Sequence, residues 1–586
     1  MFGKTGAAVR NGDDLARHRR LMTWVRIVVC AAAVAAACVL SPSVRAETPS
    51  ADPNQKAAAS GQGAAGVDAP APAAEPEAPQ PFDIDEFRID GADKLAQIDV
   101  EEAIYPFLGP SRTPKDVEKA RAALEKAYHD RGYQTVNVSV PPQNVSTRVV
   151  VLKVAEVKVG RLRVAKSRYY DVEKIKAKVP SLKEGAVPNF NDVTTDIVAI
   201  NQWPDRRVTP ALRAGVAPGT VDVDLNVEDR IPIHASVEYN NRQSPSTTQT
   251  LLNATVRYEN LWQRGHSLTA SYQVAPQRKE DAEAISANYL ARVTDWTSVL
   301  FYGVKTKSDV STIGGLNVIG PGQIFGTRAI FTLPTRENFF HSISFGIDYK
   351  HFGQTSRIGD SSFDTPITYY PLVVSYGATW QTEQSTTQFS AGVTTNLRGL
   401  GSGFDEFDAK RYFANANFAH FNAELSHTQQ LWRGFQLYGR VKGQLADNPL
   451  ISSEQFGLGG VDTVRGYFET EVVGDDGVAG TVELRTPDLG VLLQANMKDE
   501  TASGPARFTI FNEWRIYAFA DAGSGKIHNP LPEQTSRFDL WSYGVGTRFK
   551  LFNTVNGAVA LALPQITQTS TPKGKQAVLF SFGAEF

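Results

Sequence analysis

Apolar and polar side chains alternate along the chain from Ile231 to its last residue. Apolar residues take every second position over 233–239, 252–258 and 268–274, with polar residues between them. A period of two places one face of each strand in an apolar medium and the other face in a polar one. At about 22 residues for each strand with its loop, residues 231–586 predict roughly 16 strands.

Both a soluble β-sandwich and a transmembrane barrel would show this alternation. A sandwich would rarely need so many consecutive hairpins, or place Asn, Arg and Glu so regularly on the second face. Tyr258 and Trp262 cluster near strand ends, where a membrane interface favours aromatic rings. An even number of strands also suits a bacterial barrel. The sequence therefore predicts a transmembrane antiparallel β-barrel of about 16 strands over residues 230–586.

The last predicted strand ends with the chain. Val578, Phe580, Phe582, Ala584 and Phe586 share one face of it. Soluble proteins more often end in a frayed polar tail. A terminal aromatic residue that ends a strand resembles the signal read by the barrel-assembly machinery, and Phe582 and Phe586 are its candidate residues.

A small α/β unit is predicted over residues 82–155. Thr113, Pro114 and Asp116 form a helix start, with a cap, a proline in the first turn and an early acid. Apolar residues then recur at helical spacing until Gly132, which favours a helix end. Alternating and continuous valine-rich segments follow and predict two strands.

A second unit of similar size is predicted over residues 156–229. It opens on a strand at 157–164, continues with a helix that starts near Asn191, and closes on alternating residues at 221–228. Two consecutive units with a similar element order indicate a repeat. We interpret them as a pair of modules that capture a polypeptide; the alternative is two unrelated α/β spacers.

The first 46 residues predict a signal peptide. Four arginines (Arg17, Arg19, Arg20 and Arg26) precede an apolar run over 27–40, and Val44-Arg45-Ala46 suits cleavage. The run has about 14 residues, whereas a membrane anchor, the alternative, takes roughly 20. A lipoprotein site at Cys38 is a weaker alternative, because Ala35-Ala36-Ala37 fits it poorly.

Residues 47–81 are rich in Ala, Pro and Gly and predict a linker.

Composition beyond residue 46 excludes several kinds of chemistry. Both cysteines, Cys30 and Cys38, fall in the predicted signal peptide, so the mature chain would have no disulfide or thiolate metal site. Removal of residues 1–46 leaves 53 basic and 60 acidic residues, a net charge of −7. This net negative charge gives no indication of the basic surface that nucleic-acid binding requires.

Motifs of known enzymes are also missing. Gly523-Ser524-Gly525-Lys526 resembles part of a phosphate loop, but Ala520 replaces the first glycine and Ile527 replaces the Ser or Thr. The chain has no Gly-x-Ser-x-Gly elbow, and its nine histidines show no His-Glu-x-x-His spacing. The sequence therefore predicts no enzyme activity, no cofactor and no metal site.

A glycine-rich hairpin within the barrel region carries one arginine. Residues 454–467 contain the motif Val464, Arg465, Gly466 and Tyr467, and a later strand carries Phe519, Asp521 and Gly523. Asp521 lies opposite a wholly apolar face, so it should point into the lumen. A loop folded into the barrel could bring Arg465 to Asp521 and pin the loop there with charge-assisted hydrogen bonds. The alternative is an exposed loop and an ordinary lumenal acid, a pair worth about 0–1 kcal/mol.

The two motifs, Val-Arg-Gly-Tyr and Phe-x-Asp-x-Gly, resemble those of outer-membrane transporters that assemble or export polypeptides. From about residue 82 to 586 the chain resembles the two-partner secretion (type Vb) transporters, the haemolysin-activator or TpsB class. Shorter segments add to this resemblance: Pro218-Gly219-Thr220, Arg398-Gly399-Leu400-Gly401 and Gly474-Asp475-Asp476-Gly477. Family members often carry an N-terminal helix that plugs the pore, and residues 47–81 show no convincing amphipathic helix.

The resemblance implies two polypeptide-transport (POTRA) domains and a 16-stranded barrel in the outer membrane of a Gram-negative bacterium. It also implies ATP-free export of one large secreted exoprotein, TpsA-like and β-helical. The other partners would be outer-membrane lipid and, during biogenesis, the barrel-assembly machinery. Two alternatives stay open. An assembly factor for other barrels would need more than two periplasmic modules, and a passive porin has no use for modules or for a locked loop.

Overall fold

The computed structural model describes most of the chain after the predicted linker. The described residues are 81–201, 203, 205–245, 247–307, 310–313, 316–336, 338–353, 355–358, 361–496 and 510–586. The predicted signal peptide with Cys30 and Cys38, and the linker up to residue 80, lie outside them. The described chain divides between Ile231 and Pro232 into two compact units, each of which is treated by itself.

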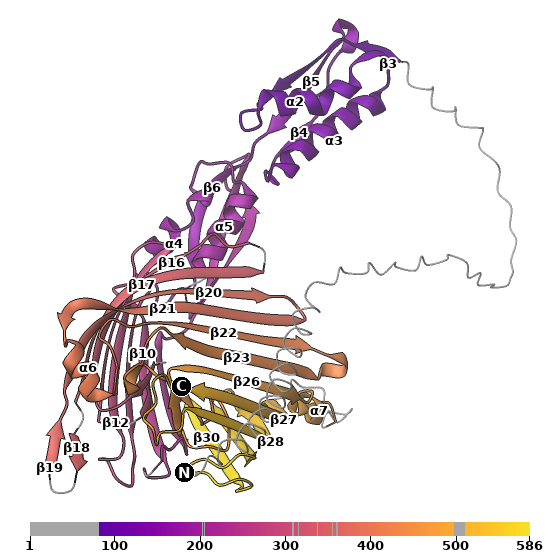
Figure 1. Cartoon of the computed structure of the whole chain (residues 1–586). Helices are drawn as coiled ribbons and strands as arrows, with labels where there is room; N and C mark the ends of the chain where they lie inside the picture. The colour runs from indigo at the N-terminus through magenta and orange to yellow at the C-terminus, as the bar shows by residue number, and fades with distance from the viewer. Residues whose placement is uncertain are drawn as a thin grey trace, which may run out of the picture. The chain divides into compact units, whose positions relative to one another are not determined.

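The first half of the α/β unit packs two helices against a three-stranded sheet (Figure 1). Its elements are β1 Phe82–Ile84, β2 Glu86–Asp90, α2 Gln97–Ile104, η1 Tyr105–Phe107, β3 Gly109–Arg112, α3 Pro114–Asp130, β4 Asn137–Ser139, η2 Val145–Thr147 and β5 Val149–Ala155. The sheet has the order β2-β5-β4, and β1 pairs with β3. β2 runs parallel to β5, and β4 runs antiparallel to it.

Helix α3 begins and ends as its sequence predicts. The Thr113 hydroxyl and amide donate to Asp116 at 2.8 and 3.0 Å, and these hydrogen bonds lower the pKa of Asp116 to about 2. Val117, Ala120 and Leu124 are buried against the sheet. Gly132 follows the helix with a φ of +97°, a conformation in which glycine avoids the steric penalty of a Cβ.

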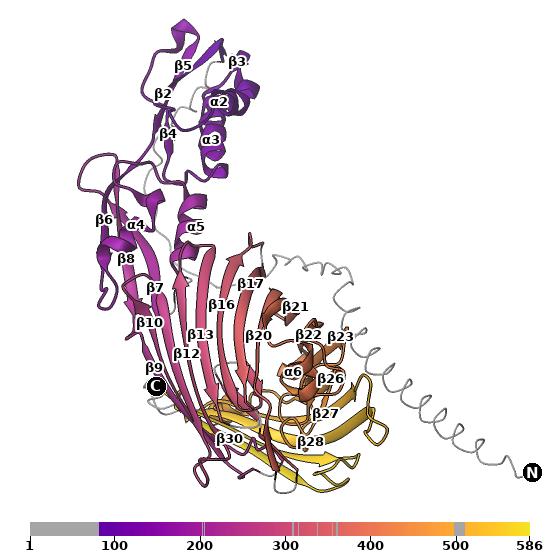
Figure 2. The ribbon, with the colours of Figure 1, turned by 60° about the vertical axis from the view of Figure 1, so that its left-hand side comes forward.

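The second half repeats this topology (Figure 2). Its elements are β6 Lys158–Ala165, α4 Val172–Ala177, η3 Pro180–Leu182, α5 Phe190–Ile200, β7 Arg206–Ala214 and β8 Thr220–Asp229. The sheet order is β6-β8-β7, with β6 parallel to β8 and β7 antiparallel to it. Helix α5 starts beside the predicted Asn191, and Asn189 caps it by accepting from the Asn191 amide at 2.9 Å. The six-residue helix α4 carries too little periodicity to be predicted.

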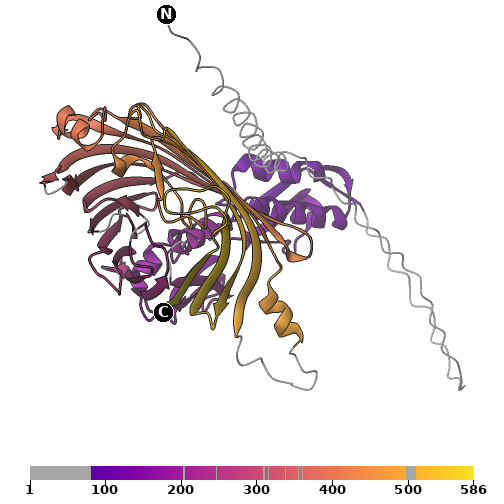
Figure 3. The same ribbon diagram turned by 60° about the horizontal axis from the view of Figure 1, so that its bottom comes forward.

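The second unit is a closed antiparallel barrel of 16 strands, which confirms the predicted fold (Figures 1 and 3). The strands in barrel order are β9 Ile233–Asn240, β10 Leu251–Leu261, β11 His266–Val274, β12 Glu283–Arg292, β13 Thr297–Thr306, β16 Gly322–Thr332, β17 Phe339–Phe352, β20 Ile367–Gln381, β21 Ser385–Gly401, β22 Ala419–Gln430, β23 Gln436–Ala446, β26 Asp476–Arg485, β27 Phe511–Lys526, β28 Arg537–Leu551, β29 Val555–Pro564 and β30 Ala577–Glu585. Strand β30 pairs with β9 and closes the barrel.

The barrel wall has an apolar outer face and a mostly polar inner face. On β20, Leu372 and Val374 are exposed outside, whereas Tyr369 is buried inside. Ser271 of β11 and Ser286 of β12 are paired in register and buried on the inner face. No helix in the described part of the chain is long and apolar enough to cross a membrane.

Several connections between barrel strands carry structure of their own. They are the hairpins β14 Val310–Ile313 with β15 Leu316–Ile319, β18 Thr355–Ile358 with β19 Ser361–Asp364, and β24 Phe456–Leu458 with β25 Val472–Gly474; the helices α6 Phe404–Lys410 and α7 Leu489–Asn496; and the 3-10 turns η4 Trp432–Gly434 and η5 Ser452–Glu454. The β24–β25 hairpin, which lies between β23 and β26 in the chain, carries Arg465.

Candidate functional site in the barrel lumen

The Arg465 hairpin comprises residues 456–474, with β24 paired to β25 and the connection 459–471 between them. Its tight path depends on glycine. Gly459 has a φ of +108°, and a Cβ there would lie 2.3 Å from the carbonyl oxygen of Phe468. Gly466 has a φ of +94°, and a Cβ there would lie 3.1 Å from the Cβ of Ala562 on β29. Glycine therefore permits the close backbone packing within the hairpin at Gly459 and the close approach of the hairpin to the barrel wall at Gly466.

The structure brings Arg465 onto Asp521 of β27. The Arg465 side chain donates from Nε to Asp521 Oδ2 and from Nη2 to Oδ1, each at 2.7 Å, and the Arg465 amide adds a bond of 3.1 Å to Oδ2. Arg465 is 3% exposed and Asp521 2%, so water does not screen the pair. A two-pronged arginine–carboxylate contact of this kind fixes orientation as well as position.

A second carboxylate, Glu483 of β26, completes the cluster. Arg465 Nη1 donates to Glu483 Oε1 at 2.6 Å. Glu483 also accepts from Arg485 at 2.8 and 2.9 Å and from Arg548 twice at 3.0 Å. The Arg465 guanidinium lies 3.6 Å from the ring centroid of Phe519, a cation–π contact. Three guanidinium groups thus share two carboxylates.

The other predicted residues of the two motifs meet at the same wall. Val464 is fully buried, and a Cβ at Gly523 would lie 3.0 Å from its Cγ2. The Tyr467 hydroxyl donates to the carbonyl oxygen of Ile566 at 2.8 Å and also lies 3.1 Å from the carbonyl oxygen of Trp541. Gly523 therefore leaves the space that the hairpin fills.

Additional polar contacts hold the tip of the hairpin. Arg242, in the connection after β9, contacts Asp462 and donates from Nε to Glu469 at 3.1 Å. Glu471 accepts from the Ser570 amide at 3.0 Å in the β29–β30 connection. The tip thus contacts segments next to both the first and the last barrel strand.

The chain that enters the hairpin is anchored as well. Glu454 is buried and contacts Tyr369; Lys350 Nζ lies 2.6 Å from its Oε1, and His420 Nε2 lies 3.2 Å from its Oε2. These partners belong to β17, β20 and β22, whereas Arg465 binds β26 and β27. The hairpin region is consequently held to different parts of the barrel wall at its entry and at its centre.

Sequence reasoning did not identify Glu483, Arg548, Arg242 or Glu454 as parts of this site. The position of Glu483 could have been predicted to face the lumen, because it is an acid between Val482 and Leu484 on an alternating strand. The remaining contacts join segments far apart in the chain.

The predicted barrel-assembly residues lie on the outer face of the last strand. Phe582 is 42% and Phe586 73% exposed. Phe586 also exchanges backbone hydrogen bonds with Ala235 of β9, at 2.8 and 3.1 Å. The terminal residue therefore belongs to the seam where the barrel closes.

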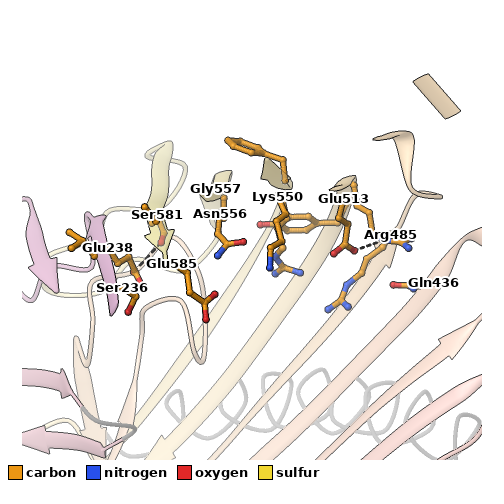
Figure 4. A pocket seen from close by; sticks show the side chains of 18 residues that line it. Ser236, Glu238, Gln436, Arg485, Glu513, Lys550, Asn556, Gly557, Ser581 and Glu585 are labelled. Atoms are coloured by element: carbon orange, nitrogen blue, oxygen red, sulfur yellow. Dashed lines mark hydrogen bonds and ion pairs between the residues drawn. The ribbon is translucent and has the colours of Figure 1, made fainter. Parts of the chain in front are cut away.

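Next to the Arg465 cluster, the lumen contains a cavity of about 520 Å³ whose lining includes Arg485 and Arg548 (Figure 4). Arg485, Glu513 and Lys550 project into it from neighbouring strands, and Ser581 donates to Glu238 at 3.0 Å across the seam. Side chains of both charges therefore line this part of the lumen. Among the described residues, no group of three or more His, Cys, Asp or Glu could hold a metal ion. Residues 523–526, which resemble part of a phosphate loop, belong to strand β27.

Comparison with known proteins gives matches over most of the chain. A family model described as haemolysin secretion/activation protein ShlB/FhaC/HecB matches residues 219–549, and one described as POTRA domain, ShlB-type, matches residues 82–156. The outer membrane transporter CdiB of Dickeya dadantii (strain 3937) is 21% identical over 474 residues, which cover 79% of this chain and 80% of that protein.

Two further similarities agree with this match. The heme/hemopexin transporter protein HuxB of Haemophilus influenzae (strain 86-028NP) is 22% identical over 399 residues, 66% of this chain and 67% of that protein. The solved structure of CdiB from Escherichia coli has a TM-score of 0.60 at 18% identity and covers 88% of this chain and 93% of that one. At this level of identity the structural likeness shows the fold.

Proposed function

Because this chain belongs to the haemolysin secretion/activation family ShlB/FhaC/HecB and is a two-partner secretion transporter of the outer membrane, we propose that it exports one large secreted exoprotein, TpsA-like and β-helical. Transporters of this class export partner exoproteins and are not enzymes. The observation that supports the proposal is the buried contact of Arg465 with Asp521 and Glu483, which holds the hairpin inside the lumen.

The parts of the chain divide this work as follows. Residues 1–46 direct the chain to the periplasm and are removed, and residues 47–81 form a linker. Residues 82–155 and 156–229 are the two periplasmic POTRA domains, and residues 230–586 form the barrel. The match of residues 82–156 to a POTRA domain of the ShlB type supports the first of these domains.

Capture of the unfolded partner takes place at a sheet edge of the POTRA domains. In both sheets the central strand, β5 or β8, is paired on its two sides, while the outer strands have one side without a strand partner in the described sheet. An extended chain that adds to such an edge gains backbone hydrogen bonds without a fixed sequence. This mode suits a partner that arrives unfolded and is held only briefly.

Passage through the barrel requires the Arg465 hairpin to move. The hairpin lies against the lumenal face of β26, β27 and β29 through Glu483, Asp521 and the close contact of Gly466 with Ala562. An exported chain cannot occupy the same space. We assign Val464, Arg465, Gly466 and Tyr467 to a loop lock, and Phe519, Asp521 and Gly523 to its receptor on the wall. No ATP is required, and folding of the partner outside gives the movement its direction.

The outer face of the last strand serves the transporter's own assembly. Phe582 and Phe586 are exposed on that face, where outer-membrane lipid surrounds the finished barrel. We assign them to the signal that the barrel-assembly machinery reads during biogenesis.

A comparison of strains with and without this protein tests the proposed cargo. Culture supernatants and outer membranes of both strains are analysed by quantitative mass spectrometry. Loss of one large extracellular protein, with other barrels unchanged, supports dedicated export. A general decrease in outer-membrane barrels would instead show an assembly factor, and no change in either fraction would show a passive channel.

A further inference from the structure

A group of apolar side chains is packed against the inner wall of the barrel near one end. Phe407 of α6 and Phe418, which follows α6, are both buried against Tyr369 of β20, with ring centroids 5.7 and 6.1 Å from the Tyr369 ring. Leu450 and Ile451 belong to the same buried cluster. We call residues 404–418 the plug segment; α6 lies on the inner side of the strands (Figure 2).

The plug segment lies at the extracellular end of the barrel. β9 directly follows the periplasmic domains in the chain, so it starts at the periplasmic end, and neighbouring strands run in opposite directions. β21, the ninth strand of the barrel, therefore ends at the extracellular side, where the plug segment connects it to β22. The Arg465 hairpin connects β23 to β26 at this same end.

One ion pair joins the plug segment to Asp475, the residue that directly follows the hairpin. Both Nη atoms of Arg411 donate to the carboxylate of Asp475, with Nη2 and Oδ2 at 2.7 Å. Asp475 is completely buried and also accepts from the amides of Leu450 at 2.8 Å and His528 at 2.6 Å, and from the Gln455 side chain at 3.1 Å. All these partners fit a charged carboxylate, because each of them donates a hydrogen.

The positions of the two residues in the chain explain what the pair connects. Arg411 is the residue directly after α6, and its amide donates to the carbonyl oxygen of Phe407 at 3.1 Å. Asp475 is the residue directly after β25, at the exit of the Arg465 hairpin. The backbone of Arg411 therefore ends the plug helix, while its side chain holds the base of the hairpin. A displacement of either segment separates this buried pair.

We propose that Arg411 and Asp475 are positioning residues that form a second latch, through which the plug segment and the Arg465 hairpin hold each other in the lumen, so that release of one segment favours release of the other. The need to clear the lumen rests on the proposed function, whereas the coupling is a property of the resting protein. Because a buried charge that loses its partner is strongly disfavoured, each segment in its resting place stabilises the other, and loss of the latch favours release of both.

Site-directed cysteine labelling of the full-length protein in outer membranes tests the coupling without any exported partner. One reporter, Val464→Cys, lies in the hairpin, and the other, Ala414→Cys, lies in the plug segment; both positions are fully buried. The rate of reaction with a membrane-impermeant maleimide measures how often each segment opens. Leu531→Cys, at a position 50% exposed in the β27–β28 connection, gives the control rate.

If the latch couples the two segments, a substitution in one segment should change the labelling rate of the reporter in the other. Arg411→Ala should raise the labelling rate of Val464→Cys by at least about fivefold, and Arg465→Ala should raise that of Ala414→Cys similarly, since coupling between two sites is reciprocal. Leu531→Cys should react at an unchanged rate in both backgrounds. If Arg411→Ala accelerates labelling of Ala414→Cys alone, or of neither reporter, the two segments are not coupled and the proposal is wrong.

Heat-modifiable migration in gels shows for each variant that the barrel has folded. Should Arg411→Ala fail this control, Asp475→Asn gives the same comparison, because it keeps the shape of the side chain and removes its charge. A uniform rise in the labelling of all three reporters would indicate general loosening of the barrel and would also contradict a latch.

Discussion

Replacement of Arg465 by alanine removes the centre of the proposed lock without touching a barrel strand. Asp521 would lose both of its side-chain hydrogen bonds to Arg465 and keep only the bond from the amide of residue 465. Glu483 would stay paired with Arg485 and Arg548. The variant therefore leaves one buried carboxylate, that of Asp521, without a cation.

The size of the effect follows from this single unpaired charge. Breaking a buried ion pair by removing one partner costs about 3–5 kcal/mol, and each 1.4 kcal/mol corresponds to a factor of about ten in an equilibrium. The docked state of the hairpin should thus lose between about two and four orders of magnitude in population relative to the undocked state. A hairpin that rarely docks cannot restore the resting state of the lumen after a chain has passed, so the transport cycle is interrupted.

Export of the partner into the medium should therefore fall strongly, while the barrel remains inserted. The assay compares the exported partner in the supernatant with the heat-modifiable barrel in the outer membrane of the same cells. Arg537→Ala is a matched control, because its side chain is 41% exposed and pairs with Asp539 on its own strand; such a pair is worth about 0–1 kcal/mol. Wild-type export by a folded Arg465→Ala barrel would refute the lock.

Three further changes test other parts of the account. Deletion of residues 82–155 should abolish binding of the partner in pull-down assays and leave a heat-modifiable barrel; retained binding would place capture elsewhere. Gly466→Ala should reduce export although Arg465 is intact, because its positive φ costs a non-glycine residue about 1–2 kcal/mol and its Cβ would press on Ala562; unchanged export would contradict this close fit. Phe586→Ser should lower the amount of barrel in the outer membrane, measured by immunoblot, and equal amounts would contradict an assembly signal in this residue.

The sequence predicts the barrel because lipid imposes a period of two on every strand. Alternation over 233–239 and 252–258 is visible without any knowledge of neighbours, and it corresponds to β9 and β10. The start of α3 is equally local, since Thr113 and Asp116 are three residues apart. Such elements could be predicted because the residues that stabilise them are close in the chain.

The rest of the site depends on contacts between distant segments. The pairing of Arg465 with Asp521 was expected only because both motifs resemble those of a known family. Arg548 reaches Glu483 across 65 positions, and Arg411 reaches Asp475 across 64. Nothing in the residues around Arg548 or Arg411 distinguishes them from other arginines. Their roles become visible only when the barrel is closed and the loops are folded into it.

A reversible disulfide between the hairpin and the wall tests most directly whether export requires the hairpin to move. Val464→Cys combined with Gly523→Cys suits this purpose, because a Cβ at Gly523 would lie 3.0 Å from Cγ2 of Val464, which places the side chains at these two positions next to each other. Each single variant serves as a control. Export should stop in the oxidised double variant and return after reduction. Undiminished export through a barrel whose crosslink is complete would show that the hairpin stays in place during transport.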